Sequence, residues 1–212
     1  MTSTRACLTP DLPATRVYLV RHGTTLLNRQ NRYRGRIDVP LDERGWQDAW
    51  GAAAELRDSG VTAIYSSPLR RARDTGRVIA DATGTGTLVD MPGIVNLDYG
   101  RWEGLTSEEA AAADPDEYAR YLAFTDDAAC PGGERLLSAA ERTLLSLHLL
   151  HLLHPGGVVV AVSHAVIVRF AIALVTGNPR TEWRCALPNG SVTAFDVTSD
   201  TIRLVRTPAA VG

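Results

Sequence analysis

The sequence contains no lysine, so all 22 of its cationic side chains are arginine. This absence excludes chemistry that depends on a lysine amine, namely Schiff-base catalysis and the Walker-type phosphate loop. Against 24 acidic residues, the arginines leave a formal net charge of −2. General nucleic-acid and membrane-surface binders usually carry a basic excess, so we expect neither kind of partner. A nearly neutral net charge still allows a local anion site, because a few arginines can lie close together without changing the net charge.

Cysteine is also scarce, with only Cys7, Cys130 and Cys185, which lie far apart and lack CxxC spacing. This pattern argues against a disulfide framework and a structural zinc site, and it favours a reducing compartment. Residues 1–15 contain no apolar run of the kind found in a secretory signal and are predicted to form a flexible leader. We therefore expect a cytoplasmic protein.

The one long apolar stretch, residues 158–175, is about as long as a membrane span. Ser163, His164 and Arg169 interrupt it, and charged groups at the middle of a bilayer are costly. The stretch is therefore predicted to be a buried strand that runs into a buried helix, rather than a transmembrane segment.

What the sequence does contain is an alternation of short β-branched runs with longer helical patterns. The expected strands cover residues 17–20, 62–65, 87–89 and 158–162, followed by a hairpin of 192–197 and 202–205. The expected helices cover residues 42–57, 68–82, 133–153 and 165–175, with Asp42 as an N-cap and Pro68 in a first turn. This alternation predicts an α/β fold, a three-layer sandwich with a mostly parallel central sheet and helices on both faces. Residues 16–212 are expected to form a single domain.

Polar residues follow three of the expected strands at the point where each strand ends. They are Arg21-His22-Gly23, Ser66 to Arg71, and Ser163-His164. Ligands of such sheets bind outside the carboxyl ends of the strands, so these segments are predicted to form one site. Guanidinium groups match phosphate oxygens, and a neutral imidazole among them is a credible nucleophile toward phosphorus. A single histidine after a strand is commonly structural, but three polar strand ends together favour a site.

These segments belong to an ordered set of motifs. The set consists of Arg21 to Asn28, Arg34-Gly35, Asp38 to Leu41, Gly45, Gln47, Ser66 to Ala72, Thr75, Gly100 to Leu105, Pro131 to Glu134, Ser163-His164, Arg169 and Asn189 to Val192. It resembles the histidine phosphatase superfamily, the phosphoglycerate mutase-like proteins, over roughly residues 17–198.

The resemblance implies a phosphomonoesterase that hydrolyses a small organic phosphate ester in two steps. His22 would attack phosphorus to form a phosphohistidine, which water then hydrolyses. Arg21, Arg71 and His164 would bind the phosphoryl oxygens. The same resemblance assigns substrate contacts to Gly23, Asn28, Asn96 and Ala165. It implies no cofactor, and it leaves a homodimer open.

The segment 106–131 occupies the place of the family's lid over the pocket. It is short here, as in the small-molecule phosphatases, so phosphoglycerate mutase activity is the less expected one. Aromatic side chains in and beside it either line the pocket or only pack the lid onto the domain: Trp102, Tyr118, Tyr121 and Phe124. No metal is expected. The three histidines at the end of the 133–153 helix recur every third residue, so their side chains point in different directions around the helix axis and cannot all face one ion.

One position departs from the family pattern. Members usually carry a glutamate four residues before the glycine of the Gly-x-Trp-Glu-Gly segment, and this residue protonates the leaving oxygen. Counting back from Gly100 leads to Asn96. An amide cannot act as a general acid, and losing such an acid costs on the order of 10²–10⁴-fold in rate.

Several explanations of Asn96 stay open. Asp98 or Glu103 is a candidate proton donor in place of the missing glutamate. The substrate could instead have a good leaving group or its own acidic proton. The remaining alternatives are altered non-phosphatase chemistry, a non-catalytic form that binds phosphate ligands, and an engineered, catalytically impaired form.

Overall fold

A six-stranded sheet forms the centre of the protein, which we describe from a computed structural model of residues 12–178, 183 and 185–208. Its strands are β1 Thr15–Arg21, β2 Ala63–Ser66, β3 Leu88–Asp90, β4 Val158–Ser163, β5 Val192–Val197 and β6 Ile202–Arg206. The strand order is β3-β2-β4-β1-β5-β6. The first four strands in this order pair in parallel, and β5 and β6 add an antiparallel hairpin beside β1. The mostly parallel sheet and the final hairpin are confirmed.

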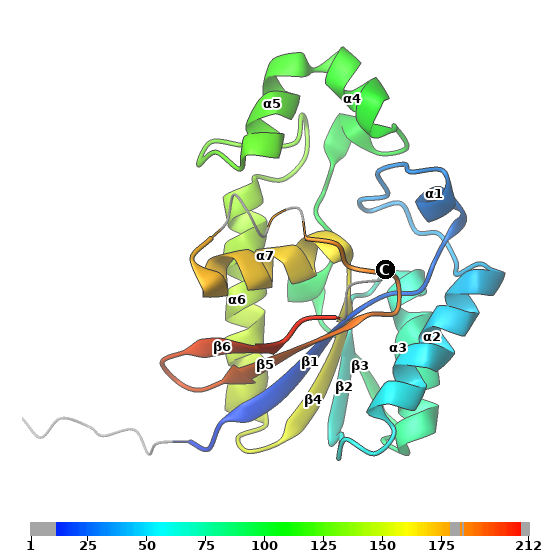
Figure 1. The fold of residues 1–212 in the computed structure, drawn as a ribbon, viewed down its shortest axis with the longest axis vertical. Coiled ribbons are helices and arrows are strands. Elements are labelled where there is room, and N and C mark those ends of the chain that lie inside the picture. The colour runs from blue at the N-terminus through cyan, green and yellow to red at the C-terminus, as the bar shows by residue number, and fades with distance from the viewer. Residues whose placement is uncertain (1–11, 179–182, 184, 209–212) are drawn as a thin grey trace, which may run out of the picture.

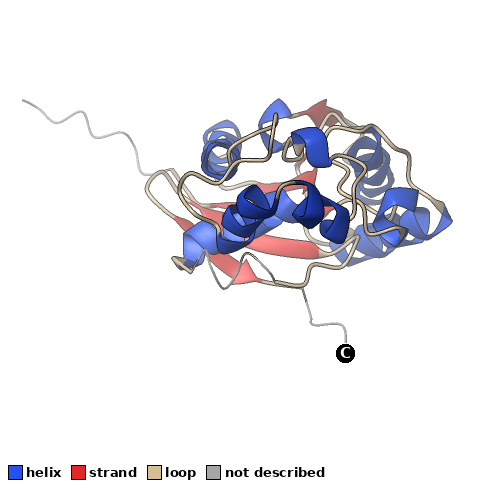
Figure 2. Ribbon diagram, turned by 90° about the horizontal axis from the view of Figure 1, so that it is seen from above, coloured by secondary structure: helices blue, strands red, loops and turns tan. Residues whose placement is uncertain are grey.

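Helices cover both faces of this sheet, as Figures 1 and 2 show. The α-helices are α1 Leu26–Arg29, α2 Glu43–Leu56, α3 Arg70–Thr83, α4 Ser107–Ala113, α5 Pro115–Ala123, α6 Leu136–Leu153 and α7 Ala165–Thr176. Short 3₁₀ turns, η1 Pro92–Ile94 and η2 Gly100–Trp102, follow β3. In Figure 1, α6 and α7 lie on one side of the sheet, α2 and α3 on the other, and α4 and α5 above it.

The side-chain alternation of β4 explains the three layers. Val159 and Ala161 belong to the core under α6 and α7, whereas Val160 and Val162 belong to the core under α2 and α3. Successive side chains of a strand point to opposite faces, so a strand that is apolar at every position must be covered twice. The expected three-layer sandwich is confirmed. The apolar stretch after residue 158 forms β4 and α7, and no helix in the described ranges is long and apolar enough to cross a bilayer.

Two expected helix starts are wrong. Pro68 does not open α3: Leu69 is the N-cap, and the carboxylate of Asp38, more than thirty residues away, accepts a hydrogen bond from the Arg70 amide at 2.7 Å. The helix expected from residue 133 begins at Leu136, because the preceding turn packs against another loop, where a Cβ on Gly133 would lie 2.4 Å from a backbone oxygen. Asp42, in contrast, caps α2 as expected, accepting from the Gly45 amide at 2.9 Å.

The predicted flexible leader, residues 1–15, overlaps the first strand. Residues 1–11 lie outside the described part of the chain, but Thr15 is fully buried as the first residue of β1. Its hydroxyl donates to the His154 carbonyl at 2.7 Å and pairs with the His151 ring at 3.0 Å. The end of the predicted leader is thus part of the folded domain.

Candidate active site

The carboxyl ends of β1, β4 and β2 lie next to one another, and their loops are tied by backbone hydrogen bonds. The His22 amide donates to the Ser163 carbonyl, and the Ser67 amide donates to the Val162 carbonyl, each at 2.9 Å. This register brings the rings of His22 and His164 into an edge contact with centroids 5.1 Å apart. The predicted convergence of the strand ends is therefore present.

His22 is held in one tautomer. Its Nδ1 lies 2.6 Å from the Gly23 carbonyl oxygen, which can only accept, so Nδ1 carries the proton and Nε2 carries the lone pair. The side chain is buried. Burial, and after it the charges of Arg71 and Arg21, holds the pKa of His22 well below its ordinary value. The ring is thus neutral at physiological pH, as a nucleophile must be.

His164 is a second buried, neutral imidazole. Its Nε2 pairs with the Ser67 hydroxyl at 2.8 Å, and its Nδ1 is buried without a protein partner. Burial and the Arg71 charge hold its pKa well below the ordinary value. His164 also lines the cavity at these strand ends.

Arg71 lies in the first turn of α3 and is completely buried. Its guanidinium donates to the carbonyls of Ile37 at 2.7 Å and Gly35 at 2.9 Å, while its Nε has no partner. Burial, followed by the charge of Arg34, lowers the pKa of Arg71 to about 9. The adjacent Arg70 instead lies at the surface and pairs with Asp74 at 3.4 Å.

Arg21 ends β1 and donates to the Leu187 carbonyl. Its Nε is buried without a partner. Burial, followed by the charges of Arg34 and Arg169, lowers its pKa to about 9. Because neither Arg21 nor Arg71 forms an ion pair within the described ranges, both present positive charge toward the pocket of the two histidines.

A cavity of about 880 Å³ opens at these strand ends. Arg21, His164 and three of the four predicted substrate contacts line it, namely Asn28, Asn96 and Ala165. His22 and Arg71 are fully buried and are not among its described lining residues, although the His22 ring contacts that of His164, which is one of them. Gly23, the fourth predicted contact, packs on the start of α2, where a Cβ would lie 2.1 Å from the Gly45 carbonyl oxygen. That position requires glycine for close backbone approach.

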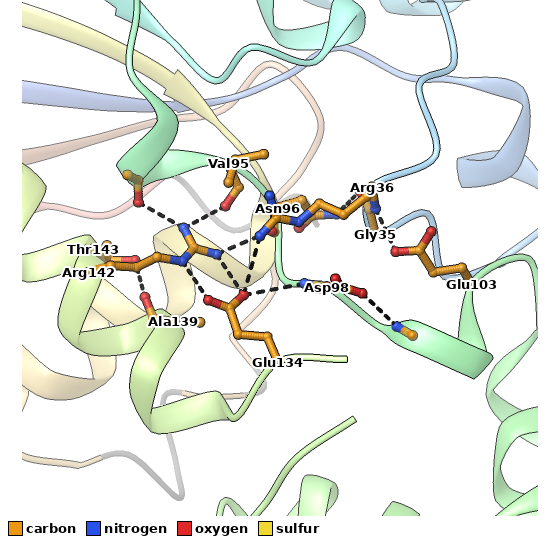
Figure 3. A network of polar contacts seen from close by, with 12 residues as sticks. Gly35, Arg36, Val95, Asn96, Asp98, Glu103, Glu134, Ala139, Arg142 and Thr143 are labelled. Atoms are coloured by element: carbon orange, nitrogen blue, oxygen red, sulfur yellow. Dashed lines mark hydrogen bonds and ion pairs between the residues drawn. The ribbon is translucent and has the colours of Figure 1, made fainter. Parts of the chain in front are cut away.

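Asn96 is fixed by a network that Figure 3 shows from close by. Arg142 of α6 donates to the Asn96 carbonyl at 3.2 Å and to two neighbouring carbonyls at 2.8 Å, and it pairs with Glu134 at 2.8 Å. The buried Asn96 amide donates to the Gly35 carbonyl at 3.1 Å. The same oxygen accepts from Arg71, so the residue that replaces the expected glutamate lies beside the arginine that is predicted to bind phosphate.

The two candidate proton donors lie elsewhere. The Asp98 carboxylate accepts from the Gly100 amide at 2.9 Å, and the Glu103 carboxylate accepts from the Arg36 amide at 2.6 Å. Neither side chain lines the cavity. Among the described lining residues, the one carboxylate is Glu108 of α4, an exposed side chain of the predicted lid.

The predicted lid, residues 106–131, contains α4 and α5 and forms one wall of the cavity. Its aromatic residues divide between the two expected roles. Tyr118 and Tyr121 line the cavity, whereas Trp102 is fully buried and Phe124 packs against Trp183 with ring centroids 5.2 Å apart. The lid is thus attached through an aromatic cluster, and two of its tyrosines line the cavity.

Sequence reasoning assigned no role to several cavity residues. Arg34, Arg169 and Asn189 belong to the motif set but were given no ligand, and Tyr33 and Tyr99 were not singled out. For the two arginines and Asn189, membership of the motif set was the signal that could have identified them as site residues.

The late histidines of α6 point to separate partners. His148 contacts the Leu144 carbonyl at 3.1 Å, and His154 pairs with the Tyr65 hydroxyl at 2.9 Å. Within the described ranges, no three histidine, cysteine or acidic side chains are grouped so as to hold a metal ion.

Comparison with known proteins settles the family. A model of the histidine phosphatase superfamily (branch 1) matches residues 17–209. The chain belongs to this superfamily. The predicted resemblance is therefore confirmed over nearly the whole chain.

Individual relatives extend this result. The bifunctional protein Rv2228c of Mycobacterium tuberculosis is 38% identical over 161 residues, 76% of this chain and 44% of that protein. This chain therefore spans less than half the length of those mycobacterial relatives. A metal-independent phosphoserine phosphatase of Arabidopsis thaliana is 31% identical over 76% of this chain and 69% of its own. The solved structure of Bacillus stearothermophilus YhfR superposes with a TM-score of 0.83 at 28% identity, covering 94% of this chain and 98% of that one.

Proposed function

We propose that this chain is a phosphomonoesterase that hydrolyses a small organic phosphate through a phosphohistidine on His22. The observation that carries the proposal is a buried, neutral His22 with Nδ1 held by Gly23 and with its pKa lowered by the charges of the buried Arg71 and the half-buried Arg21, neither of which forms an ion pair within the described ranges. Membership of the superfamily and the similarity to a phosphoserine phosphatase support it.

The proposed reaction has two displacement steps. The Nε2 lone pair of His22 attacks phosphorus, the ester P–O bond breaks, and the leaving oxygen departs with the electron pair. Arg21, Arg71 and the free Nδ1 of His164 hydrogen-bond the phosphoryl oxygens as negative charge develops on them. Water then attacks the phosphohistidine, releasing phosphate and restoring neutral His22. No step requires a cofactor.

Expulsion of the leaving group is the step that Asn96 weakens. Its amide hydrogen-bonds but supplies no proton, and Asp98 and Glu103 are engaged outside the cavity. We therefore propose a preference for esters with good leaving groups. The second candidate function, a non-catalytic phosphate-ligand module or altered chemistry, is favoured only by Asn96. A cytoplasmic location, inferred from the sparse cysteines, belongs to the same proposal.

The test is phosphate release from 4-nitrophenyl phosphate. We expect turnover by the unaltered protein and activity at background level in His22→Ala. The matched control is His148→Ala, which removes a histidine on α6 outside the cavity and is expected to keep full activity. Activity that persists in a folded His22→Ala variant would overturn the proposed mechanism.

A further inference from the structure

The cavity holds more positive charge than one phosphate can neutralise. Arg21, Arg34 and Arg169 line it, and the fully buried Arg71 interacts electrostatically with Arg34. Within the described ranges none of the four has a carboxylate ion-pair partner. A phosphate monoester carries at most two negative charges, which two guanidinium groups balance. Two buried or half-buried cations then remain without a counterion, and such charges are costly.

Arg34 and Arg169 are the two arginines of this set that the proposed reaction does not use. Arg169 lies five residues beyond His164, which at about 1.5 Å per residue places it roughly 7 Å farther along the axis of α7. Its Nε donates to the Cys185 carbonyl at 3.0 Å. Arg34 donates to the Arg32 carbonyl at 3.0 Å, and its own Nε is buried without a partner.

Arg34 interacts electrostatically with Arg169 and with two tyrosines that line the cavity. Burial lowers the pKa of Arg34, the hydroxyls of Tyr99 and Tyr121 oppose that lowering, and the Arg169 charge adds to it. The hydroxyls of Tyr99 and Tyr121 lie 3.4 Å apart. The outer part of the cavity thus combines two unneutralised guanidinium groups with neutral hydroxyl donors.

Arg32 shows that an arginine lining this cavity can have an acidic partner. It lines the same cavity but pairs with Glu109 at 2.8 Å and donates to the Gly104 carbonyl at 2.7 Å. Within the described ranges, the lack of an acidic partner beside Arg34 and Arg169 is therefore a property of their positions and not of every arginine on the cavity.

We infer that Arg34 and Arg169 form a second oxyanion subsite, so that the substrate is a phosphate monoester carrying a further acidic group, a carboxylate or second phosphate. This inference rests on the proposed function, because the ester phosphate occupies the His22 pocket. Planar guanidinium forks bind either oxyanion, and the tyrosine hydroxyls supply additional donors.

The test compares esters that differ only in the second group: phenyl phosphate, 4-carboxyphenyl phosphate and 1,4-phenylene bisphosphate. We expect the unaltered protein to favour at least one of the two esters with an acidic ring substituent over phenyl phosphate by roughly 10- to 100-fold in kcat/KM. Whether the carboxylate or the phosphate gives the larger ratio identifies the second group. Arg34→Gln and Arg169→Gln should each reduce the ratio toward one, and the matched control Arg32→Gln should leave it unchanged.

Equal kcat/KM for all three esters in the unaltered protein would overturn the subsite. So would Arg34→Gln and Arg169→Gln variants that keep the full ratio. Binding of the same esters to His22→Ala, measured by calorimetry, separates the two claims. If the unaltered protein turns over none of them but His22→Ala binds the acid-bearing esters more tightly, the proposed catalysis fails and the subsite stands. If turnover occurs without that binding preference, the subsite fails and the proposed function stands.

Discussion

Arginine is suited to this pocket in a way that lysine is not. Burial lowers the pKa of Arg21 and Arg71 to about 9, and both still carry a full charge at neutral pH. The same lowering applied to a lysine, whose ordinary pKa is about 10.4, would leave it near 7 and half deprotonated. The site therefore loses no positive charge through the absence of lysine, because a guanidinium buried to this degree keeps its charge and an amine does not.

The two buried histidines predict how stability depends on pH. Each is neutral in the folded protein at pH values where it is protonated in the unfolded chain, so the unfolded state binds more protons. The free energy of unfolding should therefore fall as pH drops below about 6.5, by up to about 1.4 kcal/mol per pH unit for each histidine. Urea unfolding at pH 7.0, 6.5, 6.0 and 5.5 measures this slope. A His22→Asn, His164→Asn variant with the same slope would contradict the assignment.

Asn96 gives a second prediction at the residue scale. Asn96→Glu should restore a general acid and raise turnover of phenyl phosphate by on the order of 10²-fold, with a smaller gain on 4-nitrophenyl phosphate, which needs less protonation. Asn96→Gln is the control, because it has the length of glutamate without an acidic proton, and it should give no gain. If Asn96→Glu binds phosphate yet gains nothing, altered chemistry or a non-catalytic role is the better account.

At the scale of elements, Arg142 of α6 fixes the loop that carries Asn96 (Figure 3). Arg142→Gln would leave three carbonyls without their donor and the half-buried Glu134 without its main partner. We expect a loss of about 2–4 kcal/mol in the free energy of unfolding. Arg120→Gln, on the exposed side of α5, is the matched control and should cost less than about 1 kcal/mol. Equal losses in urea unfolding would refute this role for Arg142.

The elements also show what the sequence could and could not reveal. Every expected strand forms, because each apolar run was short and bounded by turn residues. The start of α3 was misplaced because its cap comes from Asp38, a contact that only the tertiary structure creates. Helix α4 was missed although Thr106 and Glu109 form a capping box, a pattern visible in the sequence.

The same distinction applies to the site. His22 and His164 were predictable because both directly follow strands, and the carboxyl ends of parallel strands share one edge of the sheet. Arg34 and Arg169 reach the cavity through a loop and through one face of α7, so no local pattern places them there. Asp98 and Glu103 were reasonable candidates by spacing, but backbone amides engage both carboxylates outside the cavity.

For the whole molecule, a net charge of −2 conceals a strong local asymmetry. Most arginines outside the site pair with acids at the surface, whereas four gather without acids at one end of the sheet under α4 and α5. This division explains how a nearly neutral chain can present an anion site. His22 is the one proposed nucleophile in that site, so the chemistry of the site depends on it.

Rapid quench of the protein with ³²P-labelled 4-nitrophenyl phosphate tests that central claim most directly. The account predicts a burst of label approaching one phosphoryl group per chain, located on His22 by peptide mapping and absent from His22→Ala. Steady release of phosphate with no label on the protein, or label on a different residue, would contradict it.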